Sequence, residues 1–216
     1  MTWPRVVVVG AGGIAEAWLP ALKAEEVKVV AVVDLELEAA QRRIAEFGFD
    51  ARASTGLAEV LVADPPDFVL DLTIPEARAS VVTAALNAGC HVLSEKPMAA
   101  SRAEAKVLLE LAEKQDKLFM VSQNRRWDAK HVQIQHALRD NYVGAVGMVN
   151  CAFYLGAHFG GFRDMMENPL LLDMAIHHFD LARFFTGEDP LAVYAKGFNP
   201  QGSWYEGQAA ASCTSR

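Results

Sequence analysis

The chain has 216 residues, of which 52% are hydrophobic and 22% charged, so it can bury a sizeable core and its composition argues against disorder. Its formal net charge of -7 disfavours nucleic acid or an anionic membrane surface as a partner. The three cysteines, Cys90, Cys151 and Cys213, form no CxxC pair, which indicates a reducing compartment and no structural zinc. Because we find neither a signal-like start nor an apolar run of bilayer length, we expect a cytoplasmic protein without a membrane partner.

The first 122 residues alternate short β-branched runs with longer helical patterns. Strands are predicted at 5–10, 27–34, 68–73, 90–94 and 118–122, and helices near 13–25, 36–47, 76–88 and 101–116. Ser101 and Glu104 have the spacing of a capping box, which begins the last of these helices. Near-continuous apolar strands that alternate with helices predict a parallel sheet covered on both faces, the doubly wound α/β class.

The pattern changes after about Gln123. Helices are predicted at 128–141 and 170–185, the second ended by Gly187, and strands at 148–155 ("MVNCAFYL") and 190–198 ("PLAVYAKGF"). The strand-like segment 206–216 follows, and a sheet of two or three strands leaves apolar edges uncovered. We therefore expect either a fragment or a partner that supplies the missing surface.

The segment "VVVVGAGGIAEAW" places Gly10, Gly12 and Ala15 as G-x-G-x-x-A between a strand and a helix. Gly10 permits a tight turn, Gly12 lets the backbone approach a pyrophosphate, and Ala15 allows close helix–strand contact. Asp34 ends the second strand 19 residues after Ala15, where a carboxylate can bind the ribose diol of an adenosine. The alternative is a plain glycine turn with a helix-capping Asp34, but context and spacing favour dinucleotide binding.

Asp34 also bears on the choice of cofactor. Its charge would repel a 2′-phosphate, so the sequence favours NAD, although Arg42 or Arg43 could reach such a phosphate and NADP stays possible. The pairs Arg42–Arg43 and Arg125–Arg126 are otherwise interpreted as solvated surface charge. For Arg125 and Arg126, which follow the last strand of the parallel sheet, a role in substrate recognition is the alternative.

Two further segments carry chemistry-bearing side chains. "DMAIHHFD" puts Asp173, His177 and Asp180 at i, i+4 and i+7, on one face of a helix, with His178 turned by about 100°. An imidazole beside a carboxylate could act as a general base, could form a surface pair, or could bind a metal; the metal is the weakest alternative because no further Cys or His lies at ligand spacing.

The other segment, "SEKP", follows the strand at 90–94. Taken alone it is an ordinary strand exit. At the end of a parallel strand, however, Lys96 lies at the edge where doubly wound folds bind ligands, and a cis Lys96–Pro97 bond could fix the turn.

"GAGGIA" with "VVD", then "SEKP", then "DMAIHHFD", in this order, resemble the glucose–fructose oxidoreductase / inositol dehydrogenase family (Gfo/Idh/MocA) from about Arg5 to Phe185, and "GAVG" at 144–147 also matches. The resemblance implies an N-terminal NAD(P)-binding Rossmann domain over 1–122. It also implies a C-terminal α+β domain with a mostly antiparallel sheet, present here over 123–216 as a partial substrate and oligomerisation domain. A homo-oligomer through that sheet is the expected assembly.

The resemblance further implies hydride transfer between a nicotinamide and a secondary hydroxyl or ketone of a sugar, polyol or related small molecule. Lys96, Asp173 and His177 are the implied catalytic residues, and no metal is implied. The implied cofactor contacts are Gly10, Gly12, Gly13, Ile14, Ala15, Asp34, Thr73, Pro75, Glu95, Lys96, Pro97 and Asn124. Two alternatives stay open, an NAD-dependent glycosidase of the same architecture and a truncated, non-catalytic dinucleotide-binding protein.

Two segments depart from the family pattern. "TIPEARAS" (73–80) gives Glu76 and Ala79 where the family often has an asparagine followed by a histidine, which we expect to alter the cofactor pocket. "MENPLLLD" (166–173) replaces the usual glycine-rich approach to the histidine helix.

Overall fold

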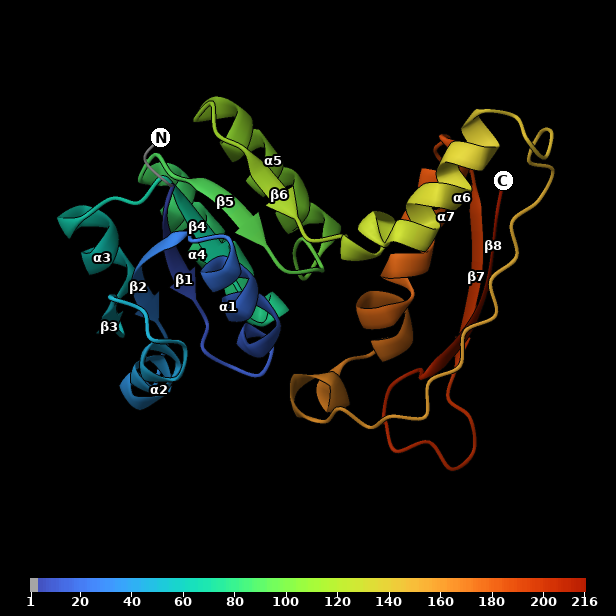
Figure 1. The fold of residues 1–216 in the computed structure, drawn as a ribbon. Helices are drawn as coiled ribbons and strands as arrows, with labels where there is room; N and C mark the ends of the chain where they lie inside the picture. Colours follow the sequence, from blue (N-terminus) through green and yellow to red (C-terminus); the bar gives the residue numbers. More distant parts are fainter. Residues whose placement is uncertain (1–3) are drawn as a thin grey trace. The chain divides into compact units, whose positions relative to one another are not determined.

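The computed structural model describes residues 4–216, and the chain divides into two compact units, Met1–Ser122 and Gln123–Arg216 (Figure 1). The first unit is built on a six-stranded, wholly parallel sheet in the order β3-β2-β1-β4-β5-β6. Its strands are β1 (Arg5–Val9), β2 (Lys28–Val33), β3 (Arg52–Ser54), β4 (Phe68–Asp71), β5 (His91–Ser94) and β6 (Phe119–Val121). The predicted doubly wound α/β class is confirmed.

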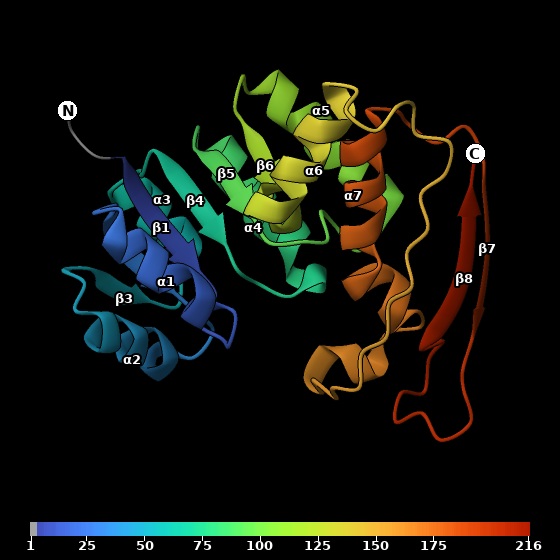
Figure 2. The same cartoon turned by 45° about the vertical axis from the view of Figure 1, so that its right-hand side comes forward.

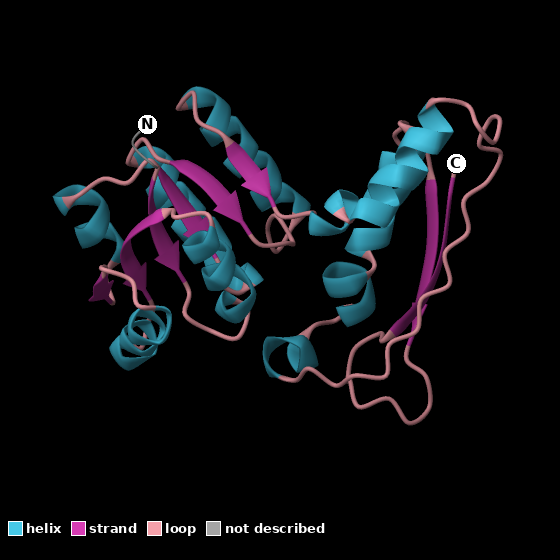
Figure 3. Ribbon diagram, viewed as in Figure 1, coloured by secondary structure: helices cyan, strands magenta, loops and turns pink. Residues whose placement is uncertain are grey.

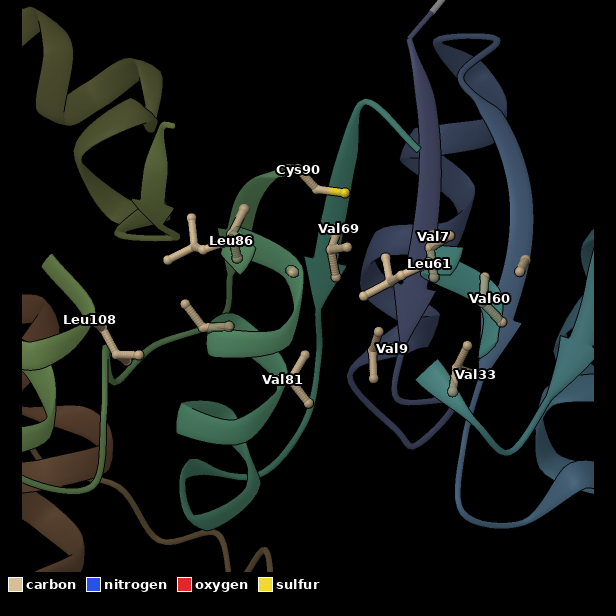
Figure 4. Close-up of a cluster of buried hydrophobic side chains, with 14 of the residues drawn as sticks. Val7, Val9, Val33, Val60, Leu61, Val69, Val81, Leu86, Cys90 and Leu108 are labelled. Carbon is tan, nitrogen blue, oxygen red and sulfur yellow. The ribbon is translucent and has the colours of Figure 1, made fainter. Parts of the chain in front are cut away.

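Helices cover both faces of this sheet, because successive residues of a buried strand point to opposite sides. Val7 and Val9 of β1 belong to one apolar cluster, shown in Figure 4, with α3 (Leu57–Ala63), α4 (Pro75–Asn87) and α5 (Arg102–Lys114). Val6 and Val8 face a second cluster, formed with α1 (Ala15–Ala24) and α2 (Leu37–Phe47).

Local signals place most of these elements. Ser101 accepts a hydrogen bond from the Glu104 amide (3.2 Å), so the predicted capping box begins α5 as expected. The sequence analysis missed β3 and α3. β3 has three residues and α3 has seven, so neither is long enough to show a recognisable repeat of apolar positions.

The second unit contains helical segments and one antiparallel strand pair, β7–β8 (Figure 2). Its elements are the 3-10 helices η1 (Asn124–Trp127) and η2 (Gly161–Met165), α6 (Ala129–Arg139), the π-helical η3 (Leu170–Met174), α7 (Ile176–Thr186), β7 (Val193–Phe198) and β8 (Ala210–Ser215). Gly187 adopts a left-handed conformation (φ 70°) and ends α7, as predicted. Within residues 4–216, no helix combines the length and apolar character needed to cross a bilayer.

Two predictions for this unit are wrong. The stretch 148–155 is not a strand but part of the long loop after α6, visible in Figure 3, and Met148 and Tyr154 are exposed. A strand needs a hydrogen-bonded neighbour, and β7 and β8 pair with each other among the described residues of this unit. The predicted continuous helix 170–185 is interrupted, because the Ala175 amide donates to the Leu170 carbonyl (2.8 Å), a π-type bond that separates η3 from α7.

Candidate functional site

The glycine turn after β1 has the shape that the fingerprint predicts. Gly10 has a φ of +101°, and a Cβ atom at this position would lie 2.9 Å from backbone atoms of Leu72, so only glycine fits. A Cβ at Gly12 or Gly13 would meet no heavy atom within 4 Å. The surface of the turn is therefore open to a ligand, and Ala15, fully buried, begins α1 directly behind it.

Asp34, the residue after β2, holds this turn by its carboxylate. Its Oδ2 accepts a hydrogen bond from the Ala11 amide (2.7 Å), and its Oδ1 accepts one from the Glu36 amide (3.0 Å). A carboxylate has about four acceptor positions, so these two bonds leave capacity for hydroxyl donors of a ligand.

Arg43 of α2 holds the same turn from its carbonyl side. Its Nε donates to the Ala11 carbonyl (3.1 Å) and its Nη2 to the Gly12 carbonyl (3.3 Å). Hydrogen bonds to Glu16 and Glu46 raise the pKa of the Arg43 guanidinium. The expectation that the Arg42–Arg43 pair is solvated is wrong for Arg43, whose side chain is only 15% exposed. The i,i+3 spacing of Arg43 and Glu46 indicates their ion pair on α2, but nothing local indicates the bonds of Arg43 to the glycine turn.

Lys96 lies in a turn that follows β5. The Lys96–Pro97 peptide bond is cis, as predicted. The Glu95 amide donates to the Asp71 carbonyl of β4 (2.9 Å), while the Glu95 carboxylate accepts from the Lys96 amide (3.1 Å) and from the indole of Trp18 (2.8 Å). The turn is thus tied to the neighbouring strand and to α1. The sequence analysis did not single out Trp18, whose partner Glu95 lies 77 positions away.

The loop after β4 completes this edge of the sheet. The amide and hydroxyl of Thr73 both donate to Oδ1 of Asp71, at 2.9 and 2.6 Å. Pro75 is the first residue of α4 and is buried. Because β1, β2, β4 and β5 are parallel and adjacent, the predicted first-unit residues, which follow these strands or begin the next helix, lie at one edge. They are Gly10, Gly12, Gly13, Ile14, Ala15, Asp34, Thr73, Pro75, Glu95, Lys96 and Pro97.

The remaining predicted residues belong to the second unit, where Asn124 begins η1. Asp173 at the end of η3 is 3% exposed, and His177 and Asp180 of α7 are 7% and 8% exposed. All three side chains are buried, but the π-type bond at Ala175 interrupts the continuous helix for which the single face was predicted. Arg163, which the sequence analysis did not single out, donates from Nε to Oδ2 of Asp173 (2.7 Å).

The Arg125–Arg126 pair is not solvated surface charge either. Arg126 donates to both carboxylate oxygens of Asp180, with its Nε at 2.9 Å from Oδ2, and this bond raises the pKa of Arg126. Arg125 Nη1 lies 3.3 Å from Nε2 of His178. Burial, and then the charge of Arg125, lower the pKa of His178. The two neighbouring histidines therefore occupy different environments, as their angular offset predicts.

A parallel sheet whose first turn is an open glycine loop, with an acidic residue after the next strand, defines a Rossmann-type dinucleotide-binding fold. Over residues 4–216, we find no group of three or more histidine, cysteine or acidic side chains that could hold a metal ion. Residues 4–123 match the family model described as the oxidoreductase family with an NAD-binding Rossmann fold, Gfo/Idh/MocA, and residues 131–215 match the C-terminal domain of that family. The chain belongs to the Gfo/Idh/MocA family.

Two curated relatives illustrate the similarity. The chain is 29% identical over 197 residues to the 1,5-anhydro-D-fructose reductase of Ensifer adhaerens, covering 87% of this chain and 58% of the relative. It is 27% identical over 201 residues to the inositol 2-dehydrogenase of Rhizobium meliloti, covering 88% and 57%. The chain thus spans less than two thirds of the length of these relatives.

Solved structures share the fold at lower identity. An oxidoreductase from Agrobacterium radiobacter, solved with NAD+, L-tartaric acid and magnesium, superimposes with a TM-score of 0.87 at 21% identity, over 99% of this chain and 63% of that one. The scyllo-inositol dehydrogenase of Lactobacillus casei with bound NAD(H) and scyllo-inositol gives 0.81 at 20% identity, over 100% and 66%.

Proposed function

We propose that the chain acts in an NAD-dependent oxidoreductase that transfers a hydride between the nicotinamide and a secondary hydroxyl or ketone of a polyol, sugar or related small molecule. The observation that carries the proposal is one edge of the parallel sheet. There the open glycine turn follows β1, Asp34 follows β2, and the Lys96 turn follows β5, which β4 separates from β1. Ligands of doubly wound folds bind at this edge. The two relatives named above, an anhydrofructose reductase and an inositol dehydrogenase, support the polyol or sugar class.

The residues of the first unit fit a dinucleotide. The space over Gly12 and Gly13 would admit a pyrophosphate against the backbone, near the positive end of α1. The remaining acceptor capacity of Asp34 suits an adenosine ribose diol, and its charge opposes the 2′-phosphate of NADP. When bound, the nicotinamide supplies the hydride acceptor for alcohol oxidation or the donor for ketone reduction.

Side chains of the protein would accept the substrate proton and stabilise the charge that develops on the substrate oxygen. We assign the His177 imidazole as the general base that takes the substrate hydroxyl proton. The Lys96 ammonium would stabilise negative charge as it develops on the substrate oxygen. Asp173, held by Arg163, would orient the substrate or the imidazole. This mechanism requires that Lys96 and His177 reach the same substrate hydroxyl.

A panel of inositols, sugars and their keto derivatives tests the activity, with absorbance of the reduced nicotinamide as the readout. Lys96→Met and His177→Asn are expected to lower kcat by at least about 100-fold, the scale of acid–base and electrostatic contributions. The rates are measured at saturating NAD, because Lys96 is also an expected cofactor contact. Lys106→Met, at an exposed position of α5, is the matched control. Near-native turnover by Lys96→Met would contradict the assignment.

The same panel separates the alternatives. Product without accumulation of reduced nicotinamide would indicate a glycosidase that oxidises only transiently. Binding of NAD without turnover of any compound would indicate a non-catalytic dinucleotide-binding protein.

We also propose a cytoplasmic homo-oligomer that associates through the β7–β8 sheet. Support comes from exposed apolar side chains on β7, among them Val193 and Tyr194. Sedimentation of the chain and of Tyr194→Lys would test the interface, because the charged variant should dissociate.

A further inference from the structure

Arg78 of α4 carries a buried positive charge. The mechanism proposed above gives this residue no role. Its side chain is 1% exposed, and its Nε donates to Oδ2 of Asp71 (3.1 Å), which is fully buried at the end of β4. A buried ion pair is costly to desolvate and needs hydrogen bonds on its remaining donors. The acceptors that bind the remaining N–H groups of Arg78 therefore indicate the structural role of the Arg78–Asp71 pair.

The other two nitrogens of the guanidinium bind backbone carbonyls of two separate loops. Nη2 donates to the Thr73 carbonyl, in the loop after β4, and Nη1 donates to the Pro97 carbonyl, in the turn after β5. One rigid, planar group thus joins the end of β4, the loop that follows it and the cis-proline turn.

Neutralising Asp71 alone would not require this arrangement. A lysine could pair with the carboxylate, but a single ammonium cannot reproduce the planar fork that reaches three acceptors. The two carbonyls belong to Thr73, a proposed cofactor contact, and to Pro97, the neighbour of Lys96. The contacts of Arg78 therefore bear on the geometry of the site as well as on the core.

We propose that Arg78 is a positioning residue, which fixes the Thr73 loop and the Lys96–Pro97 turn relative to each other and so shapes the wall for the nicotinamide end of the cofactor. This inference rests on the proposed function. In this arrangement the glycine turn and Asp34 bind the adenosine and pyrophosphate part of NAD. The two loops joined by Arg78 contact the nicotinamide part.

Binding of NAD and of ADP-ribose, which lacks the nicotinamide, tests the inference by calorimetry. Arg78→Lys keeps a cation beside Asp71 and gives up the fork, so we expect the Kd for NAD to rise about fivefold to tenfold, as for one or two lost hydrogen bonds, and the Kd for ADP-ribose to stay within about twofold. Arg43→Met is the matched contrast, because Arg43 binds the glycine turn and its loss should weaken both ligands alike. Equal changes for both ligands in Arg78→Lys, or no change in either, would overturn the inference.

A second variant tests the inference if Arg78→Lys does not fold. Asp71→Asn combined with Arg78→Gln removes both buried charges and the reach to Pro97, and it should change the ratio of the two Kd values in the same direction. If the wild-type chain binds NAD but turns over no substrate, the proposed oxidoreductase fails while the Kd ratio still decides the role of Arg78. If the wild type turns over substrate and the ratio is unchanged, only the role of Arg78 fails.

Discussion

The indole Nε1 of Trp18 donates a 2.8 Å hydrogen bond to Oε1 of Glu95 and thereby joins α1 to the turn that carries Lys96. The second carboxylate oxygen, Oε2, accepts from the Lys96 amide (3.1 Å). One carboxylate therefore connects the helix behind the glycine turn with the residue proposed to stabilise the substrate oxygen. Both side chains are half-buried, so water only partly replaces the bond when it is lost.

Trp18→Phe keeps the aromatic packing and removes the donor. We expect kcat to fall about threefold to tenfold, the size of a single hydrogen bond, because the Lys96 turn loses one of its anchors. Steady-state kinetics on the best substrate of the polyol panel measures this. Trp127→Phe, at an exposed position of η1, should leave kcat unchanged, and equal rates for the two variants would show that the Trp18 bond does not act on the turn.

Ala11 is held from opposite sides, by Asp34 at its amide and by Arg43 at its carbonyl. Arg43→Met removes the second contact, so we expect the Kd values of both NAD and ADP-ribose to rise about threefold to tenfold. Arg42→Met removes an exposed cation of the same helix and should change neither Kd by more than about twofold. If the two variants behave alike, general surface charge rather than the turn explains the effect.

Asp34 should set the preference between the two nicotinamide dinucleotides. Asp34→Asn keeps the shape of the side chain and removes the charge that a 2′-phosphate would meet. We expect the ratio of NADP affinity to NAD affinity to rise about tenfold, which corresponds to about 1.4 kcal/mol of removed repulsion. Titration of each cofactor measures the ratio, and Glu36→Gln at the exposed neighbouring position is the control. An unchanged ratio would show that Asp34 acts only on the turn.

The parts of the fold that the sequence predicts are those encoded locally. β1 and β2 are β-branched runs with little polar interruption, and the glycine turn between β1 and α1 follows from three residues in close spacing. The capping box at Ser101 and the stop at Gly187 are equally local. For these elements a short window of sequence contains the physical cause.

What the sequence did not predict depends on contacts between distant positions. The run 148–155 has strand-forming residues, but pairing is decided by the rest of the unit, which offers it no neighbouring strand among the described residues. Trp18 and Glu95 are 77 positions apart, and Arg43 and Ala11 are 32 apart. A tryptophan or an arginine on an amphipathic helix looks the same in sequence whether it is solvated or binds a distant turn.

The ion pair of Arg126 and Asp180 should stabilise the second unit. Asp180 is largely buried and its bond raises the pKa of Arg126, so the charged pair is favoured in the folded state. Asp180→Asn is expected to lower the free energy of unfolding by about 1–3 kcal/mol, measured by urea titration. Asp189→Asn breaks the exposed pair with Arg183 and should cost less than about 1 kcal/mol. Equal losses would mean that burial adds nothing to the Arg126 pair.

His178 should make the stability of the second unit depend on pH. Its pKa lies below the ordinary value of 6.5, because burial disfavours the imidazolium and Arg125 repels it, while the Met174 carbonyl opposes the shift more weakly. As the pH falls below about 6.5, the unfolded chain therefore binds a proton that the folded chain does not, so the free energy of unfolding decreases. Well above pH 6.5, from about pH 8, the residue is neutral in both states and this contribution is constant.

His178→Gln removes that proton linkage. Between pH 7.5 and 5.5 we expect the wild type to lose more stability than the variant, as measured by urea titration at each pH. His136→Gln removes an exposed histidine of α6 and serves as the control, with the wild-type pH dependence expected. A wild type and His178→Gln with parallel pH curves would show that the imidazole of His178 is protonated as readily in the folded chain as in the unfolded one, against the effect of its burial beside Arg125.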